Sequence, residues 1–126
     1  MLSEVGRREE ALGVAQEAAD IYRALAESSP DAFTPFLAGS LNNLANELSA
    51  VGRREEAVDV AREAMALYVP LAQQMPAAFG HDFLISLNTL ARVLDAAGHG
   101  DEAAEVRQAI AQMTSGGDGE EAGDEG

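Results

Sequence analysis

The sequence predicts an all-α fold, in which about five helices form antiparallel pairs stacked as an α-solenoid. The first observation is an internal repeat: when residues 2–47 are aligned with residues 48–93, 24 of the 46 pairs are identical without a gap. The second is that apolar residues recur at helical spacing along the chain. The third is a glycine at the same place in each unit, at Gly6, Gly52 and Gly98. A tandem array of helical hairpins explains these observations together.

The repeat divides the chain into three units and a tail. Residues 1–30 form an incomplete first unit, in which the end of one helix precedes a second helix over about Arg8–Ser28. Residues 31–76 form a full unit and residues 77–113 the final one. Residues 114–126 include SGGDGEEAGDEG, with five acids and five glycines, and this composition predicts a disordered acidic tail.

The full unit contains two predicted helices. Thr34 as N-cap and Pro35 in the first turn open the first helix, and its apolar residues are spaced four, three, four and three at Leu37, Leu41, Leu44, Leu48 and Val51. Gly52 ends this helix. The second helix follows the same spacing at Ala57, Ala61, Ala64, Tyr68, Leu71 and Met75, and Pro76 lies beyond its end. Pro70 lies inside it and predicts a kink.

The final unit repeats the pattern with one departure. Its helices are predicted over about Asp82–Ala97 and Asp101–Met113. Arg107 stands where the earlier units have Ala15 and Ala61, small residues against which the next helix can dock. An arginine at this position predicts that no further helix docks and that the array ends here.

The repeated motif GRREEA marks the joint between helices. Gly6 and Gly52 permit the turn, and the glutamates that follow lie in the first turn of the next helix, where the helix dipole favours acids. Small residues are predicted to let paired helices approach closely, at Ala11, Ala45, Ala57, Ala91 and Ala103. The arginines lie in the solvated bend, so the motif is predicted to be structural.

Composition excludes several classes of function. The net charge of −14, from 22 acids and 8 bases, argues against nucleic acid or an anionic membrane as partner. The chain has no cysteine, and His81 and His99 stand apart from any arrangement of nucleophile and base, so no metal, cofactor or catalytic role is expected. No apolar run approaches the length of a membrane span, and the N-terminus lacks a secretory signal, which predicts a cytoplasmic protein.

The segment NLANELSAVGRREEA, Asn43–Ala57, resembles the tetratricopeptide repeat. The matching positions are Leu44, Ala45, Gly52 and Ala57, and in the next unit Leu90, Ala91, Gly98 and Ala103. The unit is longer than the usual 34 residues, and LNNLA within a long unit is more similar to the repeats of kinesin light chain and of bacterial arrays like them. The resemblance implies a right-handed superhelix that acts as a scaffold for binding proteins.

In that family the first helices of the units line a concave groove. The resemblance therefore predicts a peptide- or protein-binding surface made of Asn42, Asn43, Asn46, Ser49, Asn88, Thr89, Arg92 and Asp95. An asparagine side chain both donates and accepts hydrogen bonds and can hold a peptide backbone, and Arg92 can bind a carboxylate. Two alternatives remain: self-association through the unpaired N-terminal helix, which would give a homo-oligomer, or a non-catalytic part of a larger signalling protein.

Overall fold

The computed structural model describes the backbone of residues 3–125 and the side chains of residues 3–115. Residues 1, 2 and 126, which belong to the predicted first unit and tail, lie outside the described residues. The described chain is all-α, with no strand, and confirms the predicted fold class. Its helices are α1 (Glu4–Ser28), α2 (Pro30–Ala50), α3 (Arg54–Gln74), α4 (Pro76–Ala96) and α5 (Gly100–Glu125).

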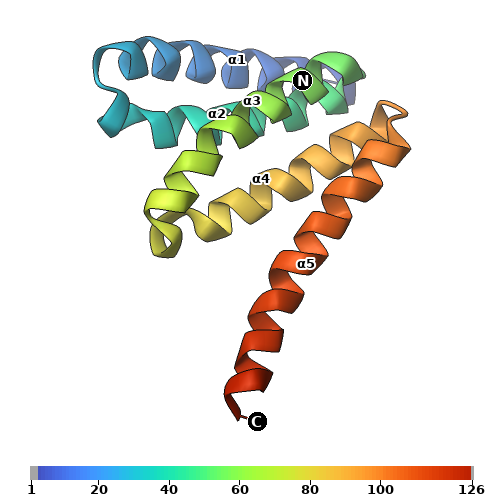
Figure 1. Cartoon of the computed structure of the whole chain (residues 1–126). Coiled ribbons are helices and arrows are strands. Elements are labelled where there is room, and N and C mark those ends of the chain that lie inside the picture. Colours follow the sequence, from blue (N-terminus) through green and yellow to red (C-terminus); the bar gives the residue numbers. More distant parts are fainter. Residues whose placement is uncertain (1–2, 126) are drawn as a thin grey trace.

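The helices stack in chain order as an α-solenoid (Figure 1). Each helix packs against the next one, and α2 also contacts α4. Consecutive helices run in opposite directions, because the links between them are too short for any other arrangement. The first helices of the units, α2 and α4, are therefore neighbours although they lie 46 residues apart in sequence.

The glycines at two joints have the backbone geometry that the sequence predicts. Gly52 and Gly98 have φ angles of 88° and 87°. The N–H of Gly52 donates to the carbonyl of Ser49 (3.1 Å), and the N–H of the next residue, Arg53, donates to the carbonyl of Leu48 (2.9 Å). The same pair of bonds recurs at Gly98, so both helices end in a Schellman motif.

The first joint differs from its prediction. Gly6 lies inside α1, which begins at Glu4 rather than near Arg8. Ser3 caps this helix, because its Oγ accepts a hydrogen bond from the N–H of Gly6 (3.0 Å). A serine cap holds the backbone in the helical conformation from Glu4 onward, so no turn forms at Gly6.

The starts of α2 and α4 also correct the sequence analysis. They begin at Pro30 and Pro76, not at Thr34 and Asp82. Proline suits the first helical position, since its fixed φ is helical and its missing N–H has no partner there. Single residues, Ser29 and Met75, therefore connect these helices to the preceding ones. α3 continues through Pro70 to Gln74 as one helix, and the kink expected there stays a prediction.

The core lies where leucines of the first helices meet alanines of the second helices. Leu44, Ala45 and Ala57 are buried together, as predicted, and so are the equivalent Leu90, Ala91 and Ala103. Ala11 is exposed instead, although it is equivalent to Ala57. Ala57 is covered by α2, the first helix of its own unit, and within the part of the chain that the structure describes no first helix covers Ala11.

The last helix is longer than predicted. α5 continues to Glu125, beyond the expected end near Met113 and through the segment expected to be a disordered tail. Helix hydrogen bonds are local, so a helix can propagate past its last packed turn. The five side chains from residue 111 to residue 115 are all exposed. Over residues 111–115, neighbouring helices therefore cover α5 only in part.

Candidate functional site

Six of the predicted partner-binding residues occupy equivalent faces of the two first helices. Asn42, Asn46 and Ser49 are spaced four and three residues apart on α2 and so share one helix face. The equivalent residues of α4, 46 positions later, are Asn88, Arg92 and Asp95. The α2 residues are half-buried and the α4 residues exposed. We call these six residues the polar column.

One acceptor in the polar column lacks a partner. The Oδ1 atom of Asn42 is buried and makes no hydrogen bond in the structure. The Oγ atom of Ser86 on α4 is also buried and also makes no hydrogen bond. A buried acceptor without a partner costs about 1–3 kcal/mol. Both atoms are closed off from solvent, so a donor from a bound peptide does not reach them in this structure.

The α4 half of the polar column is held by local contacts. Asn88 donates from Nδ2 to the carbonyl of Leu84 (3.0 Å), and Arg92 donates from Nη2 to the hydroxyl of Thr89 (3.3 Å). Asp95 forms an ion pair with Arg107 of α5. These contacts orient the three polar column side chains and still leave further donors on the guanidinium of Arg92.

The other two predicted site residues differ in their exposure. Thr89 is fully buried, so it cannot face a partner. The equivalent residue of α2, Asn43, is exposed and lines a hollow against α1 together with Glu47. The difference follows from position in the array, because α4 has another first helix, α2, packed beside it, whereas α2 has none on the corresponding side.

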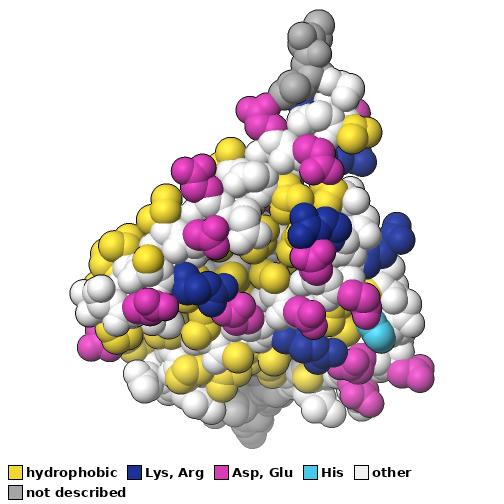
Figure 2. Space-filling view, turned by 90° about the horizontal axis from the view of Figure 1, so that it is seen from above, with side chains coloured by type: hydrophobic (Ala, Val, Ile, Leu, Met, Phe, Trp, Pro, Cys, Tyr) yellow, Lys and Arg dark blue, Asp and Glu magenta, His cyan; other side chains and the backbone are white. Residues whose placement is uncertain are grey.

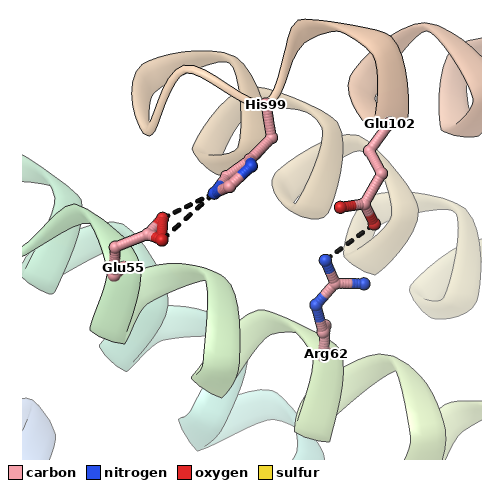
Figure 3. A network of polar contacts seen from close by, with 4 residues as sticks. All are labelled: Glu55, Arg62, His99 and Glu102. Atoms are coloured by element: carbon pink, nitrogen blue, oxygen red, sulfur yellow. Dashed lines mark hydrogen bonds and ion pairs between the residues drawn. The ribbon is translucent and has the colours of Figure 1, made fainter.

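Ion pairs that the sequence analysis did not predict join the second helices. Arg23 of α1 pairs with Glu63 of α3 (2.6 Å), and Arg62 of α3 pairs with Glu102 of α5 (2.7 Å). Figure 3 shows the second pair beside a contact of 2.6 Å between His99 Nε2 and Glu55. Both arginine pairs join residues 40 positions apart, but Arg23 and Arg62 are not equivalent in the 46-residue repeat, so the repeat gives no signal for them.

Hydrogen bonding shifts the pKa of several of these charged groups. The bond to Glu63 raises the pKa of Arg23 above its ordinary value, against a smaller opposing effect of burial. At the second joint, the bond between Arg53 and Glu56 raises the pKa of the guanidinium and lowers that of the carboxyl. The side chains of these pairs are about half exposed, so each pair contributes little to stability. The charges of the GRREEA motif therefore form intramolecular contacts at the second joint.

The described residues contain no arrangement typical of a catalytic or metal centre. No cluster of three or more histidine, cysteine, aspartate or glutamate side chains among them could hold a metal ion. No helix within the described residues is long and apolar enough to cross a membrane. Figure 2 shows arginine and acidic side chains interleaved with exposed hydrophobic ones on one face of the molecule. A mixture of this kind is ordinary for a protein surface and does not by itself mark a binding site.

Comparison with known protein families identifies one repeat. Residues 37–69, from α2 into α3, match the model of the tetratricopeptide repeat. Comparisons with curated proteins and with solved structures gave no match. The matched segment contains Leu44, Ala45, Gly52 and Ala57, the residues on which the sequence resemblance rests. The match supports a relationship to the tetratricopeptide repeat family, whose members are typically scaffolds for protein–protein interaction.

Proposed function

We propose that the chain is a non-catalytic interaction scaffold that binds an extended peptide, or a segment of a protein, along the polar column of α2 and α4. The observation that carries this proposal is the recurrence of polar residues at equivalent positions of two neighbouring first helices. The tetratricopeptide match over residues 37–69 supports the same function.

The chemistry of the polar column favours recognition of a peptide backbone. Asn46 can accept a hydrogen bond from a backbone N–H, and the side-chain amides of Asn42 and Asn46 can donate one to a carbonyl, whatever the peptide sequence. Arg92 can bind an acidic side chain or a C-terminal carboxylate of the same peptide. We further propose that the unit belongs to the long-repeat, kinesin light chain-like arrays, and that the protein acts in the cytoplasm. A second proposal is that it is the terminal part of a longer array, in which a preceding unit covers α1.

A selection from a random peptide display library tests this function. Selected peptides should lose binding when Asn42, Asn46 and Arg92 are replaced together by alanine. The control variant is Gln108→Ala, which removes an exposed amide side chain of α5, outside the predicted binding surface. Circular dichroism establishes that both variants keep their helices. Peptides that bind the triple variant as well as they bind the unchanged chain would contradict the proposal.

A further inference from the structure

Helix α1 has two apolar faces, and only one of them is covered. Leu12, Ala15 and Ala19 are buried against α2. A second row of apolar side chains runs along the same helix at spacings of three and four residues. We call this row the open stripe, and it consists of Ala11, Val14, Ala18, Ile21 and Leu25. Val14 and Ile21 are 64% and 51% exposed.

The equivalent row on α3 shows what such a stripe binds. The residues 46 positions later are Ala57, Val60, Ala64, Leu67 and Leu71. On α3 these residues are buried or half-buried, and Ala57 and Ala64 are fully inaccessible, because α2 packs against this helix. The open stripe therefore has the shape and apolarity that an α2-like helix covers elsewhere in the same molecule.

The opposite end of the array is built differently. On α5 the positions equivalent to Leu12 and Ala15 are Ala104 and Arg107. Arg107 is exposed and forms an ion pair with Asp95, so this end presents polar groups to water. The array thus has a polar surface at one end and an apolar surface at the other. Exposure of apolar side chains to water is unfavourable. Burial of the open stripe under another apolar surface is therefore favourable.

Acidic groups border the open stripe. A hollow of about 530 Å³ between α1 and α2 is lined by apolar residues of α1 and by Glu10 and Glu47, with Arg7 as its basic residue. Glu17 lies one helical heptad beyond Glu10 and is also exposed. Glu47 stands where α4 has the buried Val93, so this edge of the stripe is suited to a cationic neighbour.

The same acids disfavour a second copy of this chain as the occupant. Two open stripes packed together would bring the glutamates of each copy near those of the other, and each chain carries a net charge of −14. We propose that the open stripe binds an amphipathic helix of a partner protein. The partner helix has leucine and alanine along one face, at the spacing found in α2, and lysine or arginine along the edge that meets Glu10, Glu17 and Glu47.

A synthetic helix based on α2 can serve as the probe. The basic probe has the sequence of residues 30–51 with Asp31→Lys, Asn43→Lys and Glu47→Lys, and the second probe keeps the native residues at these positions. Both are acetylated and amidated so that their ends carry no charge. We expect the full chain to bind the basic probe in titration calorimetry, and to bind the native-sequence probe at least about tenfold more weakly at low salt.

Matched variants of the chain locate the binding surface. The double substitution Val14→Glu and Ile21→Glu should weaken binding of the basic probe at least about tenfold, because both side chains lie in the open stripe. Ile85→Glu is the control, since Ile85 is a similarly exposed isoleucine on α4, at 43%. Replacing Glu10 and Glu17 by glutamine should weaken binding by roughly twofold to tenfold and reduce its dependence on salt.

Three results would overturn the proposal. One is no binding of the basic probe at concentrations up to about 1 mM. Another is binding that survives the Val14→Glu and Ile21→Glu substitutions but is lost with Ile85→Glu, which would place the probe on the surface of α4. The third is a stable dimer of the unchanged chain in analytical ultracentrifugation that the same double substitution dissociates, which would make a second copy the occupant.

Discussion

At the scale of single residues, the joints depend on a backbone conformation that glycine adopts without strain. Gly52 has a φ of 88°, whereas Gly13 lies inside α1 with open space around the position of a Cβ atom. Gly52→Ala should therefore destabilise the fold by about 1–2 kcal/mol. Gly13→Ala should stabilise it by up to about 1 kcal/mol, because alanine favours the helix. Urea unfolding measures both, and the same sign for the two substitutions would contradict this account of the joint.

Tyr68 and Gly39 illustrate a contact that the next unit does not repeat. A Cβ atom at Gly39 would lie 3.5 Å from the hydroxyl of Tyr68. The next unit has Ile85 and Thr114 at these two positions. Both side chains are exposed, so the two residues do not reproduce the contact between Gly39 and Tyr68.

Burial of Tyr68 predicts a loss of stability in alkaline solution. Burial raises the pKa of its hydroxyl above 10, and the charge of Asp82 adds to the effect. The folded state therefore holds this proton more tightly than the unfolded state does, so the contribution is complete below about pH 10 and is lost as the pH rises through the folded-state pKa. Tyr68→Phe should flatten the decline of the unfolding temperature above pH 10. If the unfolding temperature of the variant fell just as steeply above pH 10, groups other than Tyr68 would cause the loss of stability.

At the scale of the element, α3 contains a residue that a helix interior disfavours. Pro70 is exposed and lies four residues before the end of α3, and α1 has Ala24 at the equivalent position. Proline removes a helix hydrogen bond and crowds the preceding turn, at a cost of about 3 kcal/mol in a helix interior. Pro70→Ala should raise the free energy of unfolding by about 1–3 kcal/mol.

The reciprocal substitution is the control for Pro70→Ala. Ala24→Pro in α1 should lower the free energy of unfolding by a similar amount, because Ala24 is exposed and loses no packing contact. Guanidinium unfolding followed by circular dichroism gives both values. A lower free energy of unfolding for Pro70→Ala would contradict this account, because it would mean that a packing contact of Pro70 stabilises the fold.

The helices and their pairing were predictable from the sequence, and their ends were less so. Leucine spacing and the joints at Gly52 and Gly98 identified α2 to α5, because helix periodicity and left-handed glycine are local properties. The helix starts at Pro30 and Pro76 do not follow from the pattern. The sequence analysis places Pro76 beyond the end of a helix, whereas in the structure it is the first residue of the next one.

The site residues were less predictable than the helices, for a non-local reason. Equivalent positions in a repeat have the same backbone geometry but not the same neighbours. Thr89 is buried because α2 lies beside α4, and Asn43 is exposed because no other first helix among the described residues lies on that side of α2. Ala11 and Ala57 differ for the same reason. The pattern of one unit therefore predicts which helix face a residue occupies, whereas its burial depends on the place of the unit in the array.

At the scale of the whole molecule, stability is expected to be a sum over neighbouring helices. Each helix contacts the one before and the one after it, and the single further contact joins α2 to α4. Arg23–Glu63 and Arg62–Glu102 add connections between second helices, but their exposure makes them weak. Removing an internal helix should therefore destroy the array, whereas removing material from an unpacked end should change little.

Two truncations at the C-terminal end separate the packed part of α5 from its extension. Deleting residues 114–126 removes five acids and no buried side chain among those described, so the free energy of unfolding should stay within about 0.5 kcal/mol of the original. Ending the chain after Ala97 instead removes Ala103 and Val106 from the core that contains Leu90 and Leu94. Exposure of the two leucines should lower stability by about 3 kcal/mol or more. Urea unfolding at 0.15 M salt measures both. A large loss from the shorter deletion would show that the acidic segment packs on the array, contrary to the sequence prediction of an unpacked tail.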